Sequence, residues 1–197
     1  SHYFAKKHKD EKYPDYLLCI DNFDVGKNGE LPPKKKIRHK NLCDDVFNEL
    51  SKQLSKHNEM IEHYLHAYDN IPPWILISIF SFGMLRSFYY CLSNKDQNEI
   101  ARVFGLKPDE LDSYLTALNI YRNSCAHDER IYSKQLNSRV VRKDIDGTKR
   151  EYQRVYVVIL ILKDMLDSSS FMSFYSALDD YLAELQRNLK SIEIDKI

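Results

Sequence analysis

Apolar residues recur every three or four positions along much of this sequence, which is the spacing of one face of an α-helix. The pattern is clearest downstream of Pro108. A proline in the first turn, followed by Asp109 and Glu110 near the positive end of the helix dipole, favours a helix start there. The face that we expect this helix to bury comprises Leu111, Leu115, Leu118, Tyr121 or Arg122, and Cys125.

Other stretches show the same spacing, so we expect an all-α fold. Asn41 is expected to cap a helix over residues 41–54, and residues 59–68 continue it, either as a further segment or as one long or kinked helix. Residues 74–92 are predicted as a largely buried helix with Arg86 as its only charge, followed by a shorter helix that begins at Asn94 or Asp96 and is closed by Gly105. The remaining predicted helices are residues 155–166 and a last amphipathic helix that Ser168 or Ser169 caps. The apolar side of that last helix would carry Phe171, Phe174, Leu178, Tyr181, Leu182 and Leu185.

One segment departs from the helical pattern. Between Arg139 and Arg154, the pair Asp146-Gly147 is a hairpin signal, so we expect a small β-hairpin inserted in the C-terminal half. Its arms are basic and are either a solvated excursion or a flap that contacts RNA. The candidate contacts are Arg139, Arg142, Lys143, Lys149 and Arg150.

A second basic run lies near the N-terminus, after glycines and prolines that are typical of loops. We expect this run to be a loop, either simply solvated or in contact with phosphates at the mouth of an RNA site. Its candidate contacts are Lys34, Lys35, Lys36, Arg38 and Lys40. Residues 1–40 are thus predicted as an N-terminal extension of the same domain, residues 41–190 as the helical domain, and residues 191–197 as a frayed tail.

Composition narrows the class of protein. A chain of 197 residues with 43% hydrophobic and 29% charged residues is typical of one globular domain. Its formal net charge is zero, so the whole molecule does not attract nucleic acid, and RNA binding must come from local patches. The longest apolar run, residues 71–82, is too short to span a bilayer, and we expect no membrane association.

The cysteines and histidines do not form a metal-binding pattern. Four single cysteines without a C-x-x-C spacing favour neither a zinc site nor a disulfide framework, and a reducing cytoplasm is the simplest inference. No second cluster complements the acidic and histidine residues of the segment 59–66, so we expect no metal and no cofactor. The residues considered for that site are Glu59, Glu62, His63 and His66.

The end of the helix that begins at Pro108 carries a dense group of polar side chains. At about 100° per residue, Asn123, His127 and Arg130 form one stripe, whereas Arg122 lies about 140° from His127. One straight helix therefore cannot aim Arg122 and His127 at the same phosphate. Either the helix distorts near its end, or a second copy of the chain supplies the missing partner across a two-fold axis.

The stretches 72–75, 76–85 and 100–106, taken with the polar stretch 118–132, resemble the abortive-infection (Abi-like) family of bacterial phage-defence proteins. The resemblance is best over residues 72–136 and looser over residues 3–69. That family belongs to the HEPN ribonucleases, whose signature is an arginine, a polar residue and a histidine at the spacing of Arg122, Asn123 and His127. Members usually carry a further N-terminal segment, so the resemblance implies that a sequence beginning at Ser1 is truncated.

The resemblance implies a HEPN-like helical bundle and a metal-independent endoribonuclease that acts as a toxin or phage-defence effector. Histidine titrates near neutrality and can act as base or acid, while arginine offers paired donors to phosphate oxygens. In a homodimer one His127 would be the base and the other the acid, with Asn123 orienting His127 and Arg130 holding the next phosphate. The expected partners are RNA, a second copy of the chain, and an antitoxin that is protein or RNA.

Two alternatives stay open at the level of sequence. In the first alternative the motif is structural: Arg122 pairs with Glu129 or Asp128, and His127 caps the helix end. Otherwise the chain is a catalytically silent helical module that binds RNA or a partner protein. Nothing in the residues themselves reports on phage, so the biological role rests on the family resemblance.

Overall fold

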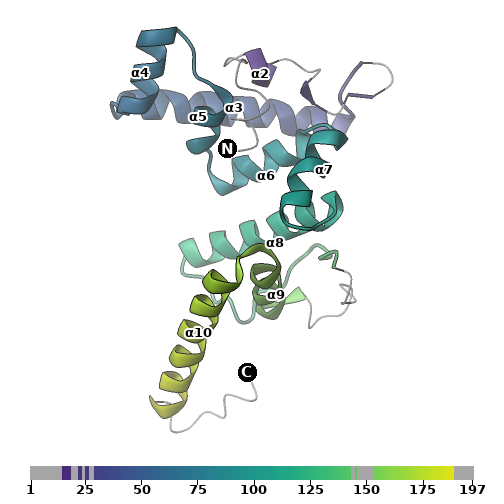
Figure 1. Cartoon of the computed structure of the whole chain (residues 1–197), viewed down its shortest axis with the longest axis vertical. Helices are drawn as coiled ribbons and strands as arrows, with labels where there is room; N and C mark the ends of the chain where they lie inside the picture. Colours follow the sequence, from purple (N-terminus) through teal and green to yellow (C-terminus); the bar gives the residue numbers. More distant parts are fainter. Residues whose placement is uncertain are drawn as a thin grey trace. The chain divides into compact units, whose positions relative to one another are not determined.

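The structure is a computed structural model that describes residues 15–18, 22–23, 25–26, 29–142, 145 and 153–188. Within these ranges the regular secondary structure is α-helical and no β-strand occurs, which confirms the all-α prediction (Figure 1). The helices are α2 (Asp15–Leu18), α3 (Pro33–Ser55), α4 (Glu59–Tyr68), α5 (Pro73–Ser78), α6 (Phe82–Cys91), α7 (Asn94–Val103), α8 (Pro108–Ala126), α9 (Val155–Met165) and α10 (Ser168–Asn188).

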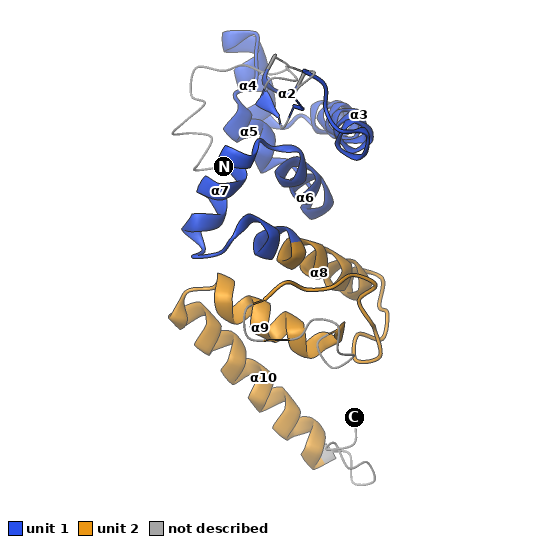
Figure 2. Ribbon diagram, turned by 90° about the vertical axis from the view of Figure 1, so that its right-hand side faces the viewer, with its two compact units in different colours: residues 1–112 blue, residues 113–197 orange. Residues whose placement is uncertain are grey.

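The chain divides into two compact units, residues 1–112 and residues 113–197, and the boundary falls within α8 (Figure 2). In the first unit, α3 packs along α6. Their shared core includes Leu42 and Val46 of α3 with Phe88 of α6, all nearly inaccessible to solvent. Phe23 stacks edge-on against Phe88, with ring centroids 6.2 Å apart, and closes one end of this core.

The N-terminal basic run is helical, so the prediction of a loop there is wrong. α3 begins at Pro33 rather than at Asn41, and Lys34 to Lys40 form its first turns. Proline is well tolerated at a first helical position, and lysine and arginine are good helix formers. The buried ring of His39 also lies 2.8 Å from the carbonyl oxygen of Leu17, which ties this part of α3 to α2.

The structure decides between one helix and two in two stretches of the first unit. α3 and α4 do not form one long helix, because His57 adopts a left-handed φ of 52° and Asn58 caps α4 by accepting from the amides of Met60 and Ile61. Residues 74–92 are likewise not one helix. α5 ends at Ser78, and the Ser81 side chain accepts from the amide of Met84 to begin α6. Serine favours such caps over helix interiors.

Other predicted boundaries are confirmed. α7 ends as expected, with Gly105 in a left-handed conformation at φ 67°. α8 begins at the predicted Pro108, and α9 occupies the predicted segment 155–166. α10 is a helix as predicted, although Asp167 rather than Ser168 or Ser169 accepts from the amide of Ser170 at its start.

The second unit is built on the C-terminal part of α8 and on α9. Tyr114 of α8 and Ile161 of α9 are buried in its core together with Leu136 and Val140 of the connecting segment. α10 is different, since none of its described side chains is buried. The apolar side that was predicted for it is only partly covered, and Tyr181 remains 59% exposed.

The predicted β-hairpin falls largely outside the described residues. Asp146-Gly147 and the basic residues Lys143, Lys149 and Arg150 lie there, as does the predicted tail 191–197. The described residues 139–142 contain no strand. The amide of Leu136 donates to the carbonyl oxygen of Gln153 at 2.7 Å, so the two ends of the excursion meet. In the part of the chain that the structure describes, no helix has the length and apolar character needed to cross a membrane.

Candidate functional site

The last turns of α8 separate buried supports from exposed polar side chains. Tyr121 and Ser124 are buried, whereas Arg122, Asn123 and His127 are exposed. Cys125 is also exposed, so the prediction that it continues the buried face is wrong. The buried positions Tyr114, Ala117, Tyr121 and Ser124 recur at spacings of three and four, and this register turns the motif side chains outward.

A defined backbone motif ends α8 next to His127. Asp128 adopts a left-handed φ of 53°. Its amide donates to the carbonyl oxygen of Cys125 at 3.4 Å, and the amide of Glu129 donates to that of Ser124 at 2.9 Å. This pair of bonds is the Schellman arrangement, which satisfies carbonyls that a helix end would otherwise leave unpaired. The amide of His127 still bonds to the carbonyl oxygen of Asn123 at 3.1 Å, so the backbone stays helical up to His127 and reverses after it.

The backbone at the end of α8 determines the directions in which Arg122 and His127 point. α8 ends at Ala126, and the amide of His127 bonds to the carbonyl oxygens of both Asn123, at 3.1 Å, and Ser124, at 3.3 Å. A separation of about 140° between the side chains of Arg122 and His127 is the value expected for a regular helix. Both alternatives offered by the sequence, a change of geometry near the helix end and a second copy of the chain, therefore stay open.

The segment that follows α8 is fastened to the buried side of the helix. Ser124 Oγ donates to Glu129 Oε2 at 2.8 Å, and Lys134 Nζ donates to the same oxygen at 2.5 Å. The hydrogen bonds from Lys134 and Ser124 hold the pKa of Glu129 below its usual range. Tyr121 Oη donates to the carbonyl oxygen of Lys134 at 2.8 Å, and burial raises the pKa of this phenol to about 12. These bonds brace the helix end that carries His127.

The motif side chains themselves are largely without partners. Arg122 Nη1 donates to Asn123 Oδ1 at 3.2 Å, so this amide contacts the arginine rather than orienting His127. Among the described residues, neither the His127 ring nor the Arg130 guanidinium has a hydrogen-bond partner, although the His127 ring interacts electrostatically with the carboxylate of Glu129. Glu129, which the sequence offered as a partner for Arg122, is held by Lys134 instead. The guanidinium groups of Arg122 and Arg130 and the ring of His127 are thus exposed to solvent.

The basic residues at the start of α3 lie on different faces of the helix. Lys34, Lys36 and Lys40 are exposed, and Lys36 lies 3.7 Å from Glu30. Lys35 and Arg38 are half-buried and lie over the ring of Tyr90, at 5.5 Å and 4.6 Å from its centroid. These five residues belong to the first unit, whereas Arg122, His127 and Arg130 belong to the second.

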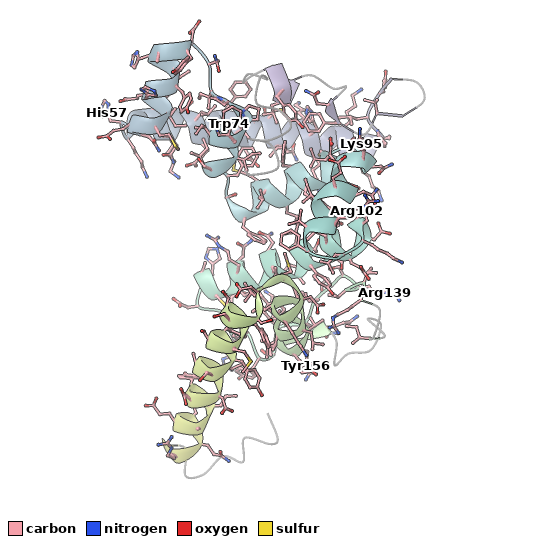
Figure 3. All side chains as sticks on the ribbon, in the orientation of Figure 1. His57, Trp74, Lys95, Arg102, Arg139 and Tyr156 are labelled. Atoms are coloured by element: carbon pink, nitrogen blue, oxygen red, sulfur yellow. The ribbon has the colours of Figure 1, made fainter. Side chains whose placement is uncertain are left out.

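The two described arginines of the predicted flap have different environments. Arg139 is exposed (Figure 3). The guanidinium of Arg142 donates twice to the carboxylate of Asp164, from Nε at 2.7 Å and from Nη2 at 3.0 Å. A carboxylate therefore already holds Arg142. Within the described residues, no three His, Cys, Asp or Glu side chains gather in a way that would hold a metal ion.

The geometry defines an all-helical protein that presents a braced Arg-Asn-x3-His motif at a helix end. The sequence profile of the Abi-like protein family matches residues 2–133, a range that includes α3 to α8 and the whole motif. Since the match covers well over half of the chain, the chain belongs to the Abi-like family. Searches among curated proteins and among solved structures returned no match. Family membership supports a role in abortive infection, the bacterial defence against phage.

Proposed function

We propose that this protein is a metal-independent endoribonuclease of HEPN type, acting as a toxin or effector in abortive infection, with Arg122, Asn123 and His127 at its reaction centre. The observation that carries the proposal is the exposure of Arg122 and His127, neither of which is held in an ion pair among the described residues, at a helix end that Ser124 and Glu129 brace. Exposure is ordinary for arginine, but a purely structural role would tie these side chains to the fold through hydrogen bonds or ion pairs.

The proposed reaction needs only proton transfer and charge stabilisation. His127 takes the proton of a ribose 2′-OH, and the 2′-oxygen attacks the adjacent phosphorus. The bond to the 5′-oxygen breaks, and that oxygen receives a proton from a second acid, for which His127 of another copy of the chain is suited. The products are a 2′,3′-cyclic phosphate and a 5′-hydroxyl. Arg122 offsets the negative charge that grows on the phosphorane.

RNA contacts outside the reaction centre follow from the exposed cations. Arg130 lies three residues beyond His127 and is suited to a neighbouring phosphate. Exposed Arg139 and the exposed lysines of α3 are further candidates, and Arg142 is excluded from this set because Asp164 holds it. An exposed active centre of this kind has to be restrained in the cell, which suits control by an antitoxin, either protein or RNA.

The test is cleavage of total RNA by the purified protein in excess EDTA. We expect cleavage to persist without divalent metal and to fall about 10²- to 10⁴-fold in His127→Ala, the usual loss for an acid–base group. Arg122→Ala should lose about 10²-fold or more. Matched controls are His66→Ala and Arg102→Ala, which remove exposed side chains of the same types on α4 and α7 and should cut RNA like the wild type.

Two results would contradict the proposal. Cleavage that His127→Ala retains in full would place the reaction elsewhere. Tight RNA binding by a wild-type protein that never cuts would identify a silent binding module instead. Chemical analysis of the fragment ends provides an independent check, because only attack by the 2′-OH leaves a cyclic phosphate.

A further inference from the structure

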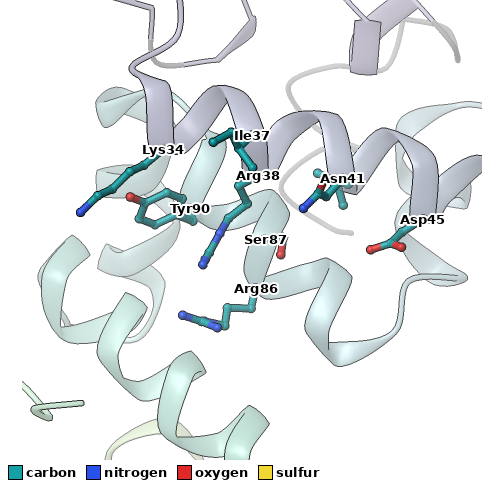
Figure 4. Close-up of a pocket in the computed structure, with 9 residues that line it drawn as sticks. Lys34, Ile37, Arg38, Asn41, Asp45, Arg86, Ser87 and Tyr90 are labelled. Carbon is teal, nitrogen blue, oxygen red and sulfur yellow. The ribbon is translucent and has the colours of Figure 1, made fainter. Parts of the chain in front are cut away.

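The first unit contains an open cavity of about 510 Å³ between α3 and α6, which the ribonuclease motif does not use. Figure 4 shows the side chain of Arg38 from α3 approaching that of Arg86 from α6, while Lys34 extends from the start of α3 past the ring of Tyr90. Asn41 and Asp45 line the cavity further along α3. Volumes of about 300 to 1,000 Å³ are typical of sites for small molecules.

The cationic end of the cavity contains hydrogen-bond donors without acceptors. Nη1 of Arg38 and Nε of Arg86 are both shielded from solvent, and neither has a hydrogen-bond partner among the described residues. Leaving such donors unpaired is unfavourable, and bringing two guanidinium groups together adds repulsion. Burial, and then the charge of Arg38, lower the pKa of Arg86, which reflects the same strain. An anion placed between the two groups would relieve both penalties.

The arrangement is held in place by its neighbours. The guanidinium of Arg38 lies 4.6 Å from the centroid of the Tyr90 ring, a favourable cation–π contact that fixes its position. Asp112 does not line the cavity, but its carboxylate interacts with Arg86 and Arg38 and offsets part of their charge. Two guanidinium groups and one carboxylate leave a net positive charge at this end, and Lys34, one turn before Arg38 and exposed, adds to it.

The opposite end has different chemistry. Asn41 can both donate and accept hydrogen bonds, and Asp45 offers a carboxylate that accepts from hydroxyl groups. A small inorganic anion would satisfy the cationic end and leave these groups unused. A ligand that spans both ends must carry an anion at one side and hydroxyl or amino groups at the other.

We propose that this cavity binds a nucleoside phosphate, with the phosphate between Arg38, Arg86 and Lys34 and the ribose toward Asn41 and Asp45. Bidentate donors on arginine suit phosphate oxygens. The same chemistry is present in a free nucleotide and in the 5′-phosphorylated end of an RNA strand. The site lies in the first unit and is independent of His127, so it stands or falls separately from the proposed cleavage reaction.

Isothermal titration calorimetry of the full chain tests the site. The chain carries His127→Ala so that RNA stays intact, and adenosine 5′-monophosphate is the first probe. We expect Arg38→Gln and Arg86→Gln each to weaken its binding about tenfold or more, as expected for loss of a charge-assisted hydrogen bond. Lys34→Gln, which alters an exposed side chain and should fold normally, weakens it less. The matched control is Arg102→Gln, an exposed arginine on α7 (Figure 3), which should bind like the parent.

Titrations with further ligands distinguish a free nucleotide from an RNA end and test whether the nucleoside part is needed for binding. Stronger binding of a 5′-phosphorylated oligoribonucleotide than of its 5′-hydroxyl counterpart would assign the site to an RNA end, and preference for the mononucleotide would assign it to a free nucleotide. Inorganic phosphate that binds as tightly as the nucleotide would overturn the nucleoside part of the proposal. No binding at millimolar nucleotide, or an equal loss in Arg102→Gln, would overturn the site itself.

Discussion

The position of His127 depends on the residue that follows it. Asp128 carries the left-handed conformation that lets the chain reverse directly after the histidine, and the amide bonds of Asp128 and Glu129 close the helix. A left-handed conformation costs an ordinary L-residue about 1–2 kcal/mol, whereas glycine adopts it freely. Asp128 thus carries local strain in order to end α8 where the motif needs it.

Substitution of Asp128 separates this backbone role from any role of its carboxylate. Asp128→Gly should keep RNA cleavage and should raise or preserve the thermal unfolding midpoint. Asp128→Val should lose about 1–2 kcal/mol of stability and most of the cleavage, because a β-branched residue strongly resists this conformation. Urea denaturation and the RNA assay measure the two effects. Equal behaviour of both variants would show that the helix reversal does not position His127.

At the scale of single residues, the sequence predicted the positions of the motif side chains but not the hydrogen bonds that hold the helix end beneath them. The spacing of Arg122 and His127 and their separation around the helix could be predicted, because they depend only on helical geometry. The bonds of Ser124 and Lys134 to Glu129 could not, since they depend on the path of the chain after α8. Cys125 was misassigned because an apolar residue at a helical spacing says nothing about which flank the core covers.

Between elements, one polar network joins α8 and α9. Tyr114 Oη donates to Asp164 Oδ2 at 2.7 Å, and Arg142 donates to both oxygens of the same carboxylate. Burial raises the pKa of Asp164, but the hydrogen bonds from Arg142 and Tyr114 outweigh it, and the pKa is lowered overall. The folded state therefore prefers the ionised carboxylate more than the unfolded chain does.

This preference makes part of the stability depend on pH. A carboxylate whose pKa is lowered on folding contributes fully above its unfolded pKa of about 3.9 and loses the contribution as pH falls through its folded pKa. Asp164→Asn should therefore cost about 2 kcal/mol near neutral pH and progressively less below about pH 4. Urea denaturation at several pH values measures the difference. Asp179→Asn on exposed α10 is the control, and a deficit that does not change with pH would contradict the account.

The helices of the fold were largely predictable, whereas their interruptions were not. Periodicity located α7, α8 and α9 because each buries one regular face. It missed the break between α5 and α6, where Ser81 caps a new helix inside an apolar run that continues on both sides. It also took the cluster of lysines before Asn41 for a loop, although a clustered charge is compatible with a helix whose rear side holds His39.

For the molecule as a whole, we propose a shared site in a homodimer, which the angular separation of Arg122 and His127 expected on a regular helix supports. Each site of such a dimer draws on both chains, so a chain without Arg122 and His127 inactivates any wild-type chain that it pairs with. Mixing wild type with a ninefold excess of the double variant, Arg122→Ala with His127→Ala, should leave about one tenth of the activity per wild-type chain once subunits exchange randomly.

Controls make this experiment decisive. A ninefold excess of a chain carrying Arg102→Ala with His66→Ala should leave the activity of the mixture high, because those exposed residues lie outside the motif. Differently tagged chains verify that subunits have exchanged. Activity per wild-type chain that is unaffected by the inactive partner, in a mixture where exchange has occurred, would show that each chain cuts alone.

The three described cysteines differ sharply in their surroundings, and this difference has a practical side. Cys43 and Cys91 are buried, and burial raises the pKa of each thiol to about 11, so both remain protonated and shielded at neutral pH. Cys125 is exposed, two residues after Asn123 and two before His127. Since thiolate and access govern alkylation, a maleimide dye would label Cys125 ahead of the other two. The protein thus carries a native attachment point for a fluorophore within one helical turn of its motif.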